Sequence, residues 1–169
     1  PKAISELAPP SKHCKILITP GALSATAIAA RGLLQRGDRV LVESPVYPNA
    51  PQSLREAGGR LVPIAVSGEA DSETPAAGWD LDLMADAVDR LRPRAAYLIP
   101  DFQNPTGTVM SAAQRDQVGR MLAQGGVLAL IDESHQQLAL DGKEMPLPLA
   151  ADMITAGQVL CIAGDEAAL

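Results

Sequence analysis

The stretch Pro100-Asp101-Phe102-Gln103-Asn104-Pro105-Thr106-Gly107 decides how the rest of the chain is interpreted. It follows an apolar run over 95–99 that predicts a buried strand, and it precedes an amphipathic segment that predicts a helix. Pro105 favours an extended backbone at Asn104, and Gly107 can adopt a positive φ. The sequence therefore predicts that Asn104 lies at the carboxyl end of a strand, where open α/β sheets bind ligands. A turn in which Asn104 only caps the backbone is the alternative.

The composition indicates one globular domain that is acidic and poor in cysteine. The chain has 169 residues, of which 47% are hydrophobic, and this is enough for one core. Its net charge of −6 disfavours contact with nucleic acid by this segment. The apolar runs are far shorter than the ~20 residues of a membrane span, so no membrane contact is expected. Two cysteines without metal-ligand spacing predict no metal site and favour a cytoplasmic location.

Strands and helices are predicted to alternate along the chain. The expected strands are 16–19, 39–43, 61–64, 94–99, 127–131 and 159–162, and the expected helices are 23–34, 51–57, 81–91 and 111–124. Asp80 is expected to cap the third helix, and Ser111 with Gln114 has the spacing of a capping box for the fourth. Pro63 predicts an edge position for its strand, because proline donates no hydrogen bond. The polar stretch 67–78 predicts a surface loop.

These elements predict the fold class. Strands that are apolar throughout and separated by helices are typical of a three-layer α/β/α fold with a mostly parallel sheet. In such a fold the functional side chains gather on loops at the carboxyl ends of the strands.

Besides the Asn104 turn, three of these loops carry residues suited to a single ligand. Residues 21–24 open a helix, where free amide groups suit a phosphate, although a turn glycine explains the pattern equally well. Tyr47 stands between two prolines, and it could stack on a flat ring or pack over its own loop. Asp132 ends a buried strand, where a carboxylate needs a partner such as a protonated ring nitrogen; a cap of the next turn is the alternative.

A phosphate site, an aromatic side chain, a neutral polar side chain and a buried acid match the parts of a phosphorylated pyridine. Their order resembles that in the aminotransferases of class I and II (fold type I), which depend on pyridoxal 5′-phosphate (PLP). The stretch 100–111 is most similar to the aminotransferase-like domain of MocR-type regulators in the GntR superfamily. The resemblance covers about 16–162, and it implies the large-domain fold of PLP transferases in incomplete form.

The resemblance implies a cofactor-binding role for Ala22, Leu23, Ser24, Tyr47, Asn104, Asp132 and His135. The amides of Ala22 and Leu23, with Ser24, would bind the phosphate, and Tyr47 would stack on the ring. Asn104 would hydrogen-bond the phenolic oxygen, and Asp132 would pair with the pyridine nitrogen and keep the ring an electron sink. Where many relatives carry a tyrosine that contacts the phenolic oxygen, this chain has Ser134 and His135; His135 could replace that donor or lie in a surface loop.

The family's Schiff-base lysine has no counterpart in this chain. In the family it lies in a Ser-x-Ser-Lys stretch just after the sixth strand, and an ungapped alignment puts Ala167 near its place. The lysines of the chain are Lys2, Lys12, Lys15 and Lys143. Because no amine stands where PLP would be linked covalently, the resemblance assigns no catalytic residue, and this chain alone is expected to be inactive.

Residues 1–169 are therefore expected to form a partial large domain, without the family's small domain or any DNA-binding domain. Two functions fit this expectation. The sequence around Asn104 favours the PLP- and effector-binding domain of a GntR/MocR-type transcription regulator. The alternative is the large domain of a free-standing aminotransferase that acts on an amino acid. Either protein would bind an amino acid or amine and form a homodimer, whereas a third hypothesis is an unrelated doubly wound domain that binds another phosphate ligand.

Overall fold

The computed structural model describes residues 17–68, 78–136, 145–147, 149 and 159–162. Within these residues the strands form a six-stranded sheet in the order β3-β2-β1-β4-β5-β6. The strands are β1 (Arg39–Ser44), β2 (Arg60–Ser67), β3 (Gly78–Trp79), β4 (Ala95–Leu98), β5 (Leu128–Asp132) and β6 (Val159–Ile162). Every neighbouring pair is parallel except β2–β3, which confirms the mostly parallel sheet.

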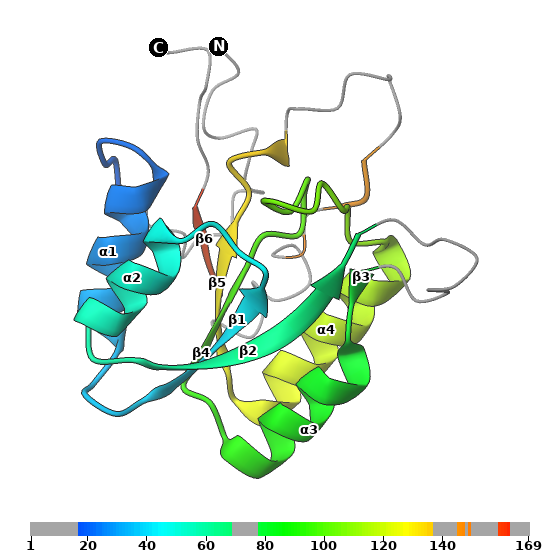
Figure 1. Ribbon diagram of the computed structural model, residues 1–169, viewed down its shortest axis with the longest axis horizontal. Coiled ribbons are helices and arrows are strands. Elements are labelled where there is room, and N and C mark those ends of the chain that lie inside the picture. The colour runs from blue at the N-terminus through cyan, green and yellow to red at the C-terminus, as the bar shows by residue number, and fades with distance from the viewer. Residues whose placement is uncertain (1–16, 69–77, 137–144, 148, 150–158, 163–169) are drawn as a thin grey trace, which may run out of the picture.

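Helices cover both faces of this sheet, as expected for three layers. They are α1 (Ala22–Leu33), α2 (Asn49–Glu56), α3 (Leu81–Leu91) and α4 (Ala112–Gly125). Figure 1 shows α1 beside α2 on one side of the sheet and α3 beside α4 on the other. None of the helices in the described ranges has the length and apolar character that crossing a bilayer requires.

Apolar side chains fill the two spaces between the sheet and its helices. Leu41 of β1 packs with Met84 and Leu122 on the side of α3 and α4. Its neighbours Val40 and Val42 face the side of α1 and α2, because successive side chains of a strand point to opposite faces. Each fully buried aliphatic side chain of this kind contributes roughly 1.5–3 kcal/mol to folding.

The helix ends confirm the expected capping residues. The Asp80 carboxylate accepts a 2.8 Å hydrogen bond from the backbone N–H of Leu83 in the first turn of α3. Ser111 and Gln114 form a capping box at the start of α4. The same helix ends at Gly126, whose φ of 66° is readily adopted by glycine.

The expected strand over 16–19 is not found where the structure describes the chain. Leu17, Ile18 and Thr19 belong to no strand, and Leu17 and Ile18 are exposed. An apolar run shows that a segment can enter a sheet, but it does not show that a neighbouring strand is there to pair with it. Cys161 in β6 is exposed, although apolar residues flank it in the sequence.

The other difference concerns β2 and the stretch after it. Gly78, expected in a loop, forms the short strand β3 with Trp79, so β2 has neighbours on both sides. The antiparallel pairing reaches only Val66 and Ser67 of β2. At Pro63, therefore, β2 has no second partner strand among the described residues. Proline suits this position because it has no N–H to donate to such a strand.

The chain connections change direction between β1 and β4. From β1 the chain runs through α2 to β2, towards one edge of the sheet. From β4 it runs through α4 to β5, towards the opposite edge. A switch of this kind leaves a crevice outside the carboxyl ends of the two central strands.

Candidate active site

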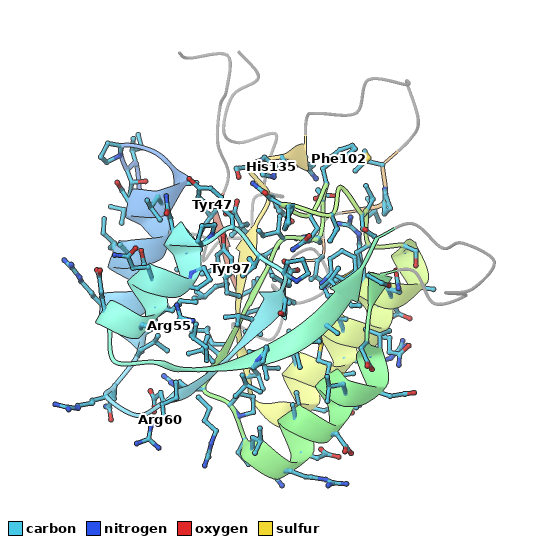
Figure 2. All side chains as sticks on the ribbon, viewed as in Figure 1. Tyr47, Arg55, Arg60, Tyr97, Phe102 and His135 are labelled. Carbon is cyan, nitrogen blue, oxygen red and sulfur yellow. The ribbon has the colours of Figure 1, made fainter. Side chains whose placement is uncertain are left out.

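A cavity of about 350 Å³ lies at this end of the sheet, large enough for a small cofactor. Six of the seven residues that the sequence singled out line it: Ala22, Leu23, Tyr47, Asn104, Asp132 and His135. Figure 2 shows Tyr47, Tyr97 and His135 at this same end. Ser24 is not part of the lining, and its hydroxyl donates a 2.9 Å hydrogen bond to the carbonyl of Pro20.

One end of the cavity is the start of α1. Gly21, with a φ of 87°, precedes the helix and supplies no side-chain cap, and the first turn contains no acidic residue. The first amide groups of a helix have no partner inside the helix. The N–H groups of Ala22 and Leu23 are thus free to bind an anion such as a phosphate, which the helix dipole also favours.

At the end of β5, the carboxylate of Asp132 accepts hydrogen bonds on both oxygens. The hydroxyl of Tyr97 donates to Oδ2 at 2.6 Å. The backbone N–H and the hydroxyl of Ser134 donate to Oδ1 at 3.1 and 2.6 Å. Asp132 is only 8% exposed, and none of the ion pairs within the described ranges includes it. Asp132 thus presents the cavity with a carboxyl group that is held by neutral donors and has no ion-pair partner within the described ranges.

Tyr97 is the main site residue that the sequence reasoning missed. It is 2% exposed, and burial together with the negative charge of Asp132 raises its pKa, so the phenol remains a donor. A buried tyrosine hydroxyl needs a partner, and this signal was present in the apolar run over 95–99. In the parallel register Tyr97 lies beside Leu130, two residues before Asp132, and this pairing brings the two side chains together. Thr26 of α1, which is 1% exposed, also lines the cavity and was not anticipated.

The loops after β1 and β4 form the other walls. The backbone N–H of Tyr47 donates a 3.0 Å hydrogen bond to the carbonyl of Asn104, which ties the two loops together. The hydroxyl of Tyr47 accepts a hydrogen bond from the side chain of Asn49, and its ring is 45% exposed. The side-chain amide of Asn104 forms no hydrogen bond within the described part of the chain, so it is available to a ligand.

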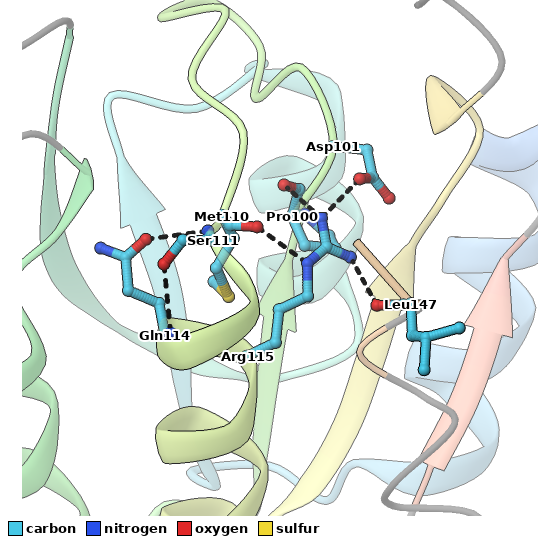
Figure 3. Close-up of polar contacts among 7 residues, drawn as sticks. All are labelled: Pro100, Asp101, Met110, Ser111, Gln114, Arg115 and Leu147. Atoms are coloured by element: carbon cyan, nitrogen blue, oxygen red, sulfur yellow. Dashed lines mark hydrogen bonds and ion pairs between the residues drawn. The ribbon is translucent and has the colours of Figure 1, made fainter. Parts of the chain in front are cut away.

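A buried ion pair supports the Asn104 turn from the side of α4 (Figure 3). The guanidinium of Arg115 donates to the carboxylate of Asp101 at 2.6 Å, and both side chains are at most 3% exposed. Arg115 also donates to the carbonyls of Pro100 and Met110, at 3.3 and 2.8 Å. These contacts hold the turn at Phe102, whose φ of 46° is uncommon for a residue other than glycine.

His135 lines the cavity, and its buried Nδ1 has no hydrogen-bond partner among the described residues. No cluster of three His, Cys, Asp or Glu side chains in the described ranges could hold a metal ion. The donor set fits a phosphorylated pyridine, since it combines an anion site, an aromatic side chain, a free amide and an unpaired carboxylate.

Comparison with known proteins supports a family assignment. The model of the family "Aminotransferase class I and II" matches residues 2–163. A 2-aminoadipate transaminase of Thermus thermophilus is 32% identical over 132 residues, which is 78% of this chain and 31% of that protein. The uncharacterized HTH-type transcriptional regulator YdcR of Escherichia coli is 30% identical over 81% of this chain and 28% of its own length.

Solved structures agree with these sequence matches. The α-aminoadipate aminotransferase LysN from Thermus thermophilus, complexed with N-(5′-phosphopyridoxyl)-L-leucine, superposes with a TM-score of 0.74 at 30% identity, over 85% of this chain and 35% of that one. An aspartate aminotransferase from Rhodobacter sphaeroides gives a TM-score of 0.80 at 28% identity, over 95% and 40%. The chain thus spans about a third of the length of its relatives. It belongs to the aminotransferase class I and II family.

Proposed function

We propose that the cavity binds PLP and that the chain is part of the large domain of an aminotransferase-like transcription regulator of the GntR/MocR type. One observation carries the cofactor assignment. Asp132 holds a hydrogen-bonded carboxyl group, without an ion-pair partner among the described residues, in a cavity that the N-terminus of α1 also lines. A protonated pyridine nitrogen and a phosphate are the two groups that satisfy these ends.

The proposal gives a task to six of the lining residues. The amides of Ala22 and Leu23 bind the phosphate, and the ring of Tyr47 covers the pyridine. Asn104 donates to the phenolic oxygen, and His135 approaches the same side of the ring. Asp132 keeps a proton on the ring nitrogen, and the bound cofactor then supplies an electron sink. Ser24, whose hydroxyl donates to the carbonyl of Pro20 just before α1, is proposed to help these amides bind the phosphate.

Relatives of both kinds bear on the choice between regulator and enzyme. The HTH-type transcriptional regulators YdcR and YisV match this chain at 30% and 32% identity, and the sequence of the Asn104 turn favours that group. The acidic segment described here would bind the cofactor and an amino acid or amine effector, in a cytoplasmic homodimer, while a separate domain binds DNA.

A free-standing aminotransferase acting on an amino acid is the second candidate. The transaminase of Thermus thermophilus favours it, with 32% identity to this chain. The reading frame of the gene separates the two. A winged-helix segment encoded upstream of Pro1 supports the regulator, whereas a start codon close upstream supports the enzyme. A Ser-x-Ser-Lys stretch encoded soon after Leu169 would supply the catalytic lysine in either case.

Calorimetric titration of the chain with pyridoxine 5′-phosphate tests the cofactor assignment. This probe has the phosphate and the pyridine ring but no aldehyde, so it cannot form a Schiff base with lysine side chains. We expect one ligand to bind per chain, PLP to displace it, and ATP at the same concentration to leave it bound. Binding of ATP without binding of pyridoxine 5′-phosphate would contradict the proposal and support an unrelated phosphate-binding domain.

A further inference from the structure

The β1–β4 ladder stops just below the cavity. Its last paired residues are Val42 and Tyr97, and beyond them the chain enters the two loops that carry Tyr47 and Asn104. Beyond the ladder, one backbone hydrogen bond, from the N–H of Tyr47 to the carbonyl of Asn104, joins these loops. Glu43, which directly follows Val42 and is 1% exposed, places a buried carboxyl group at the end of the ladder.

Glu43 accepts hydrogen bonds from three different segments. Its Oε1 accepts from the backbone N–H of Ile99 at 2.9 Å and from the indole N–H of Trp79 at 2.7 Å. Its Oε2 accepts from the side-chain amide of Gln103 at 3.0 Å. The carboxylate thus links β1 to the end of β4 and to β3, at a point where water is excluded.

Gln103 continues this link into both loops. Its Nε2 donates not only to Glu43 but also to the carbonyl of Pro45, at 2.8 Å, in the loop that leads to Tyr47. Its Oε1 accepts from the backbone N–H and the hydroxyl of Thr106, at 3.0 and 2.7 Å, inside the Asn104 turn. Every polar atom of this fully buried amide is therefore engaged.

We propose that Glu43 and Gln103 are positioning residues, which clamp the Tyr47 loop and the Asn104 turn at the separation that the ring of the cofactor requires. Neither side chain lines the cavity, so both act through the residues that do. The inference rests on the proposed PLP site and adds to it the pair that sets its width. The Tyr47–Asn104 backbone hydrogen bond of 3.0 Å joins the same two loops.

The variant Glu43→Gln tests the clamp with almost no change of shape. An amide at this position places an N–H₂ group against the Nε2 of Gln103, so two donors face each other. If Gln103 flips to relieve this conflict, its oxygen faces the carbonyl of Pro45 and its amide faces the N–H of Thr106. One atomic exchange therefore breaks contacts in both loops, while the packing around Glu43 is kept.

Amide hydrogen exchange by NMR detects the loss of these loop contacts without any ligand. The experiment is done at about pH 8, so that Glu43 is ionised. We expect Glu43→Gln to reduce the protection of the Tyr47 and Thr106 amides about tenfold relative to amides of α3. In the double variant Glu43→Gln with Gln103→Glu, the carboxylate at position 103 can accept hydrogen bonds from the amide at position 43 and from Thr106. This variant should restore the protection of the Thr106 amide. The cap variant Ser111→Ala, which lowers stability elsewhere, should leave the ratio unchanged.

The second readout is the circular dichroism that the site induces in bound pyridoxine 5′-phosphate, compared at ligand saturation. We expect a weaker signal per bound ligand in Glu43→Gln, partial recovery in the double variant, and a signal like that of the unmodified protein in Ser111→Ala. Unchanged protection, or an unchanged signal per bound ligand, in Glu43→Gln would overturn the clamp and leave the PLP site standing. If the unmodified chain binds no ligand, the PLP site itself is wrong and the inference fails with it.

Discussion

The phenol of Tyr97 donates a 2.6 Å hydrogen bond to the carboxylate of Asp132, across two neighbouring parallel strands. Both side chains are at most 8% exposed. The contact gives the carboxyl group at the end of this buried strand a hydrogen-bond donor before any ligand arrives. It also gives the central tyrosine of β4 a partner, which a buried hydroxyl requires.

Replacement of Tyr97 by Phe removes this donor and almost nothing else. Because a buried charged acceptor loses a hydrogen bond, we expect the free energy of unfolding to fall by about 1.5–3 kcal/mol. Urea denaturation measures it. Tyr47→Phe is the matched control, since its hydroxyl contacts Asn49 at an exposed position, and it should change stability by less than about 0.5 kcal/mol. Equal losses of unfolding free energy in both variants would mean that the Tyr97–Asp132 contact stabilises the fold no more than the exposed Tyr47–Asn49 contact does.

The buried carboxylate of Glu43 predicts a particular dependence of stability on pH. Burial raises its pKa from 4.5 to about 7, although the hydrogen bonds from Ile99, Gln103 and Trp79 act in the opposite sense. In the folded chain the group therefore keeps a proton at pH values where the unfolded chain has lost it. Its contribution to stability is complete below the unfolded pKa and is lost as the pH rises through the folded value.

The comparison with Glu43→Gln isolates this contribution. We expect the stability of the unmodified chain, relative to the variant, to fall by roughly 2–3 kcal/mol between about pH 5 and about pH 8. Denaturant titrations of both proteins across this interval provide the measurement. A difference that stays constant or rises with pH would show that Glu43 titrates at its ordinary value or below it.

Two ion pairs of equal length but different burial show how burial changes the contribution of an ion pair to stability. Arg115–Asp101 and Arg120–Asp116 both have a shortest N–O distance of 2.6 Å, but the side chains of the first pair are 3% and 0% exposed, and those of the second 62% and 54%. We expect Arg115→Met to cost about 3–5 kcal/mol of unfolding free energy, since it leaves Asp101 charged and buried. Arg120→Met should cost less than about 1 kcal/mol. Similar losses at the two positions, measured by thermal denaturation, would contradict the view that this pair holds the Asn104 turn.

Much of the fold follows from local sequence signals. The capping box of Ser111 and Gln114 and the apolar runs of β4, β5 and β6 act within a few residues of the chain, and all of them form as predicted. Leu17–Thr19 shows the limit of such signals, since an apolar run forms a strand only if a partner lies beside it. The strand at Trp79 was missed because two residues carry no periodicity.

The candidate site likewise combines residues that local sequence signals predict with residues that they do not. Tyr47, Asn104 and Asp132 could be singled out because each lies at or shortly after the end of an apolar strand. The buried hydroxyl of Tyr97 signalled the need for a partner, but the partners of Tyr97 and Glu43 could not be named, because those residues lie 35 and 56 positions away. Those contacts depend on the order of strands in the sheet, which periodicity alone does not contain.

The central claim is that Asp132 meets a protonated pyridine nitrogen. The most direct test compares the affinities of pyridoxine 5′-phosphate and of its analogue with carbon in place of the ring nitrogen, for the unmodified chain and for Asp132→Asn. A buried charge-assisted pair predicts at least about tenfold preference for the pyridine in the unmodified chain, and loss of that preference in the variant. Equal affinities for the two ligands in the unmodified chain, or a preference that survives in Asp132→Asn, would contradict the account.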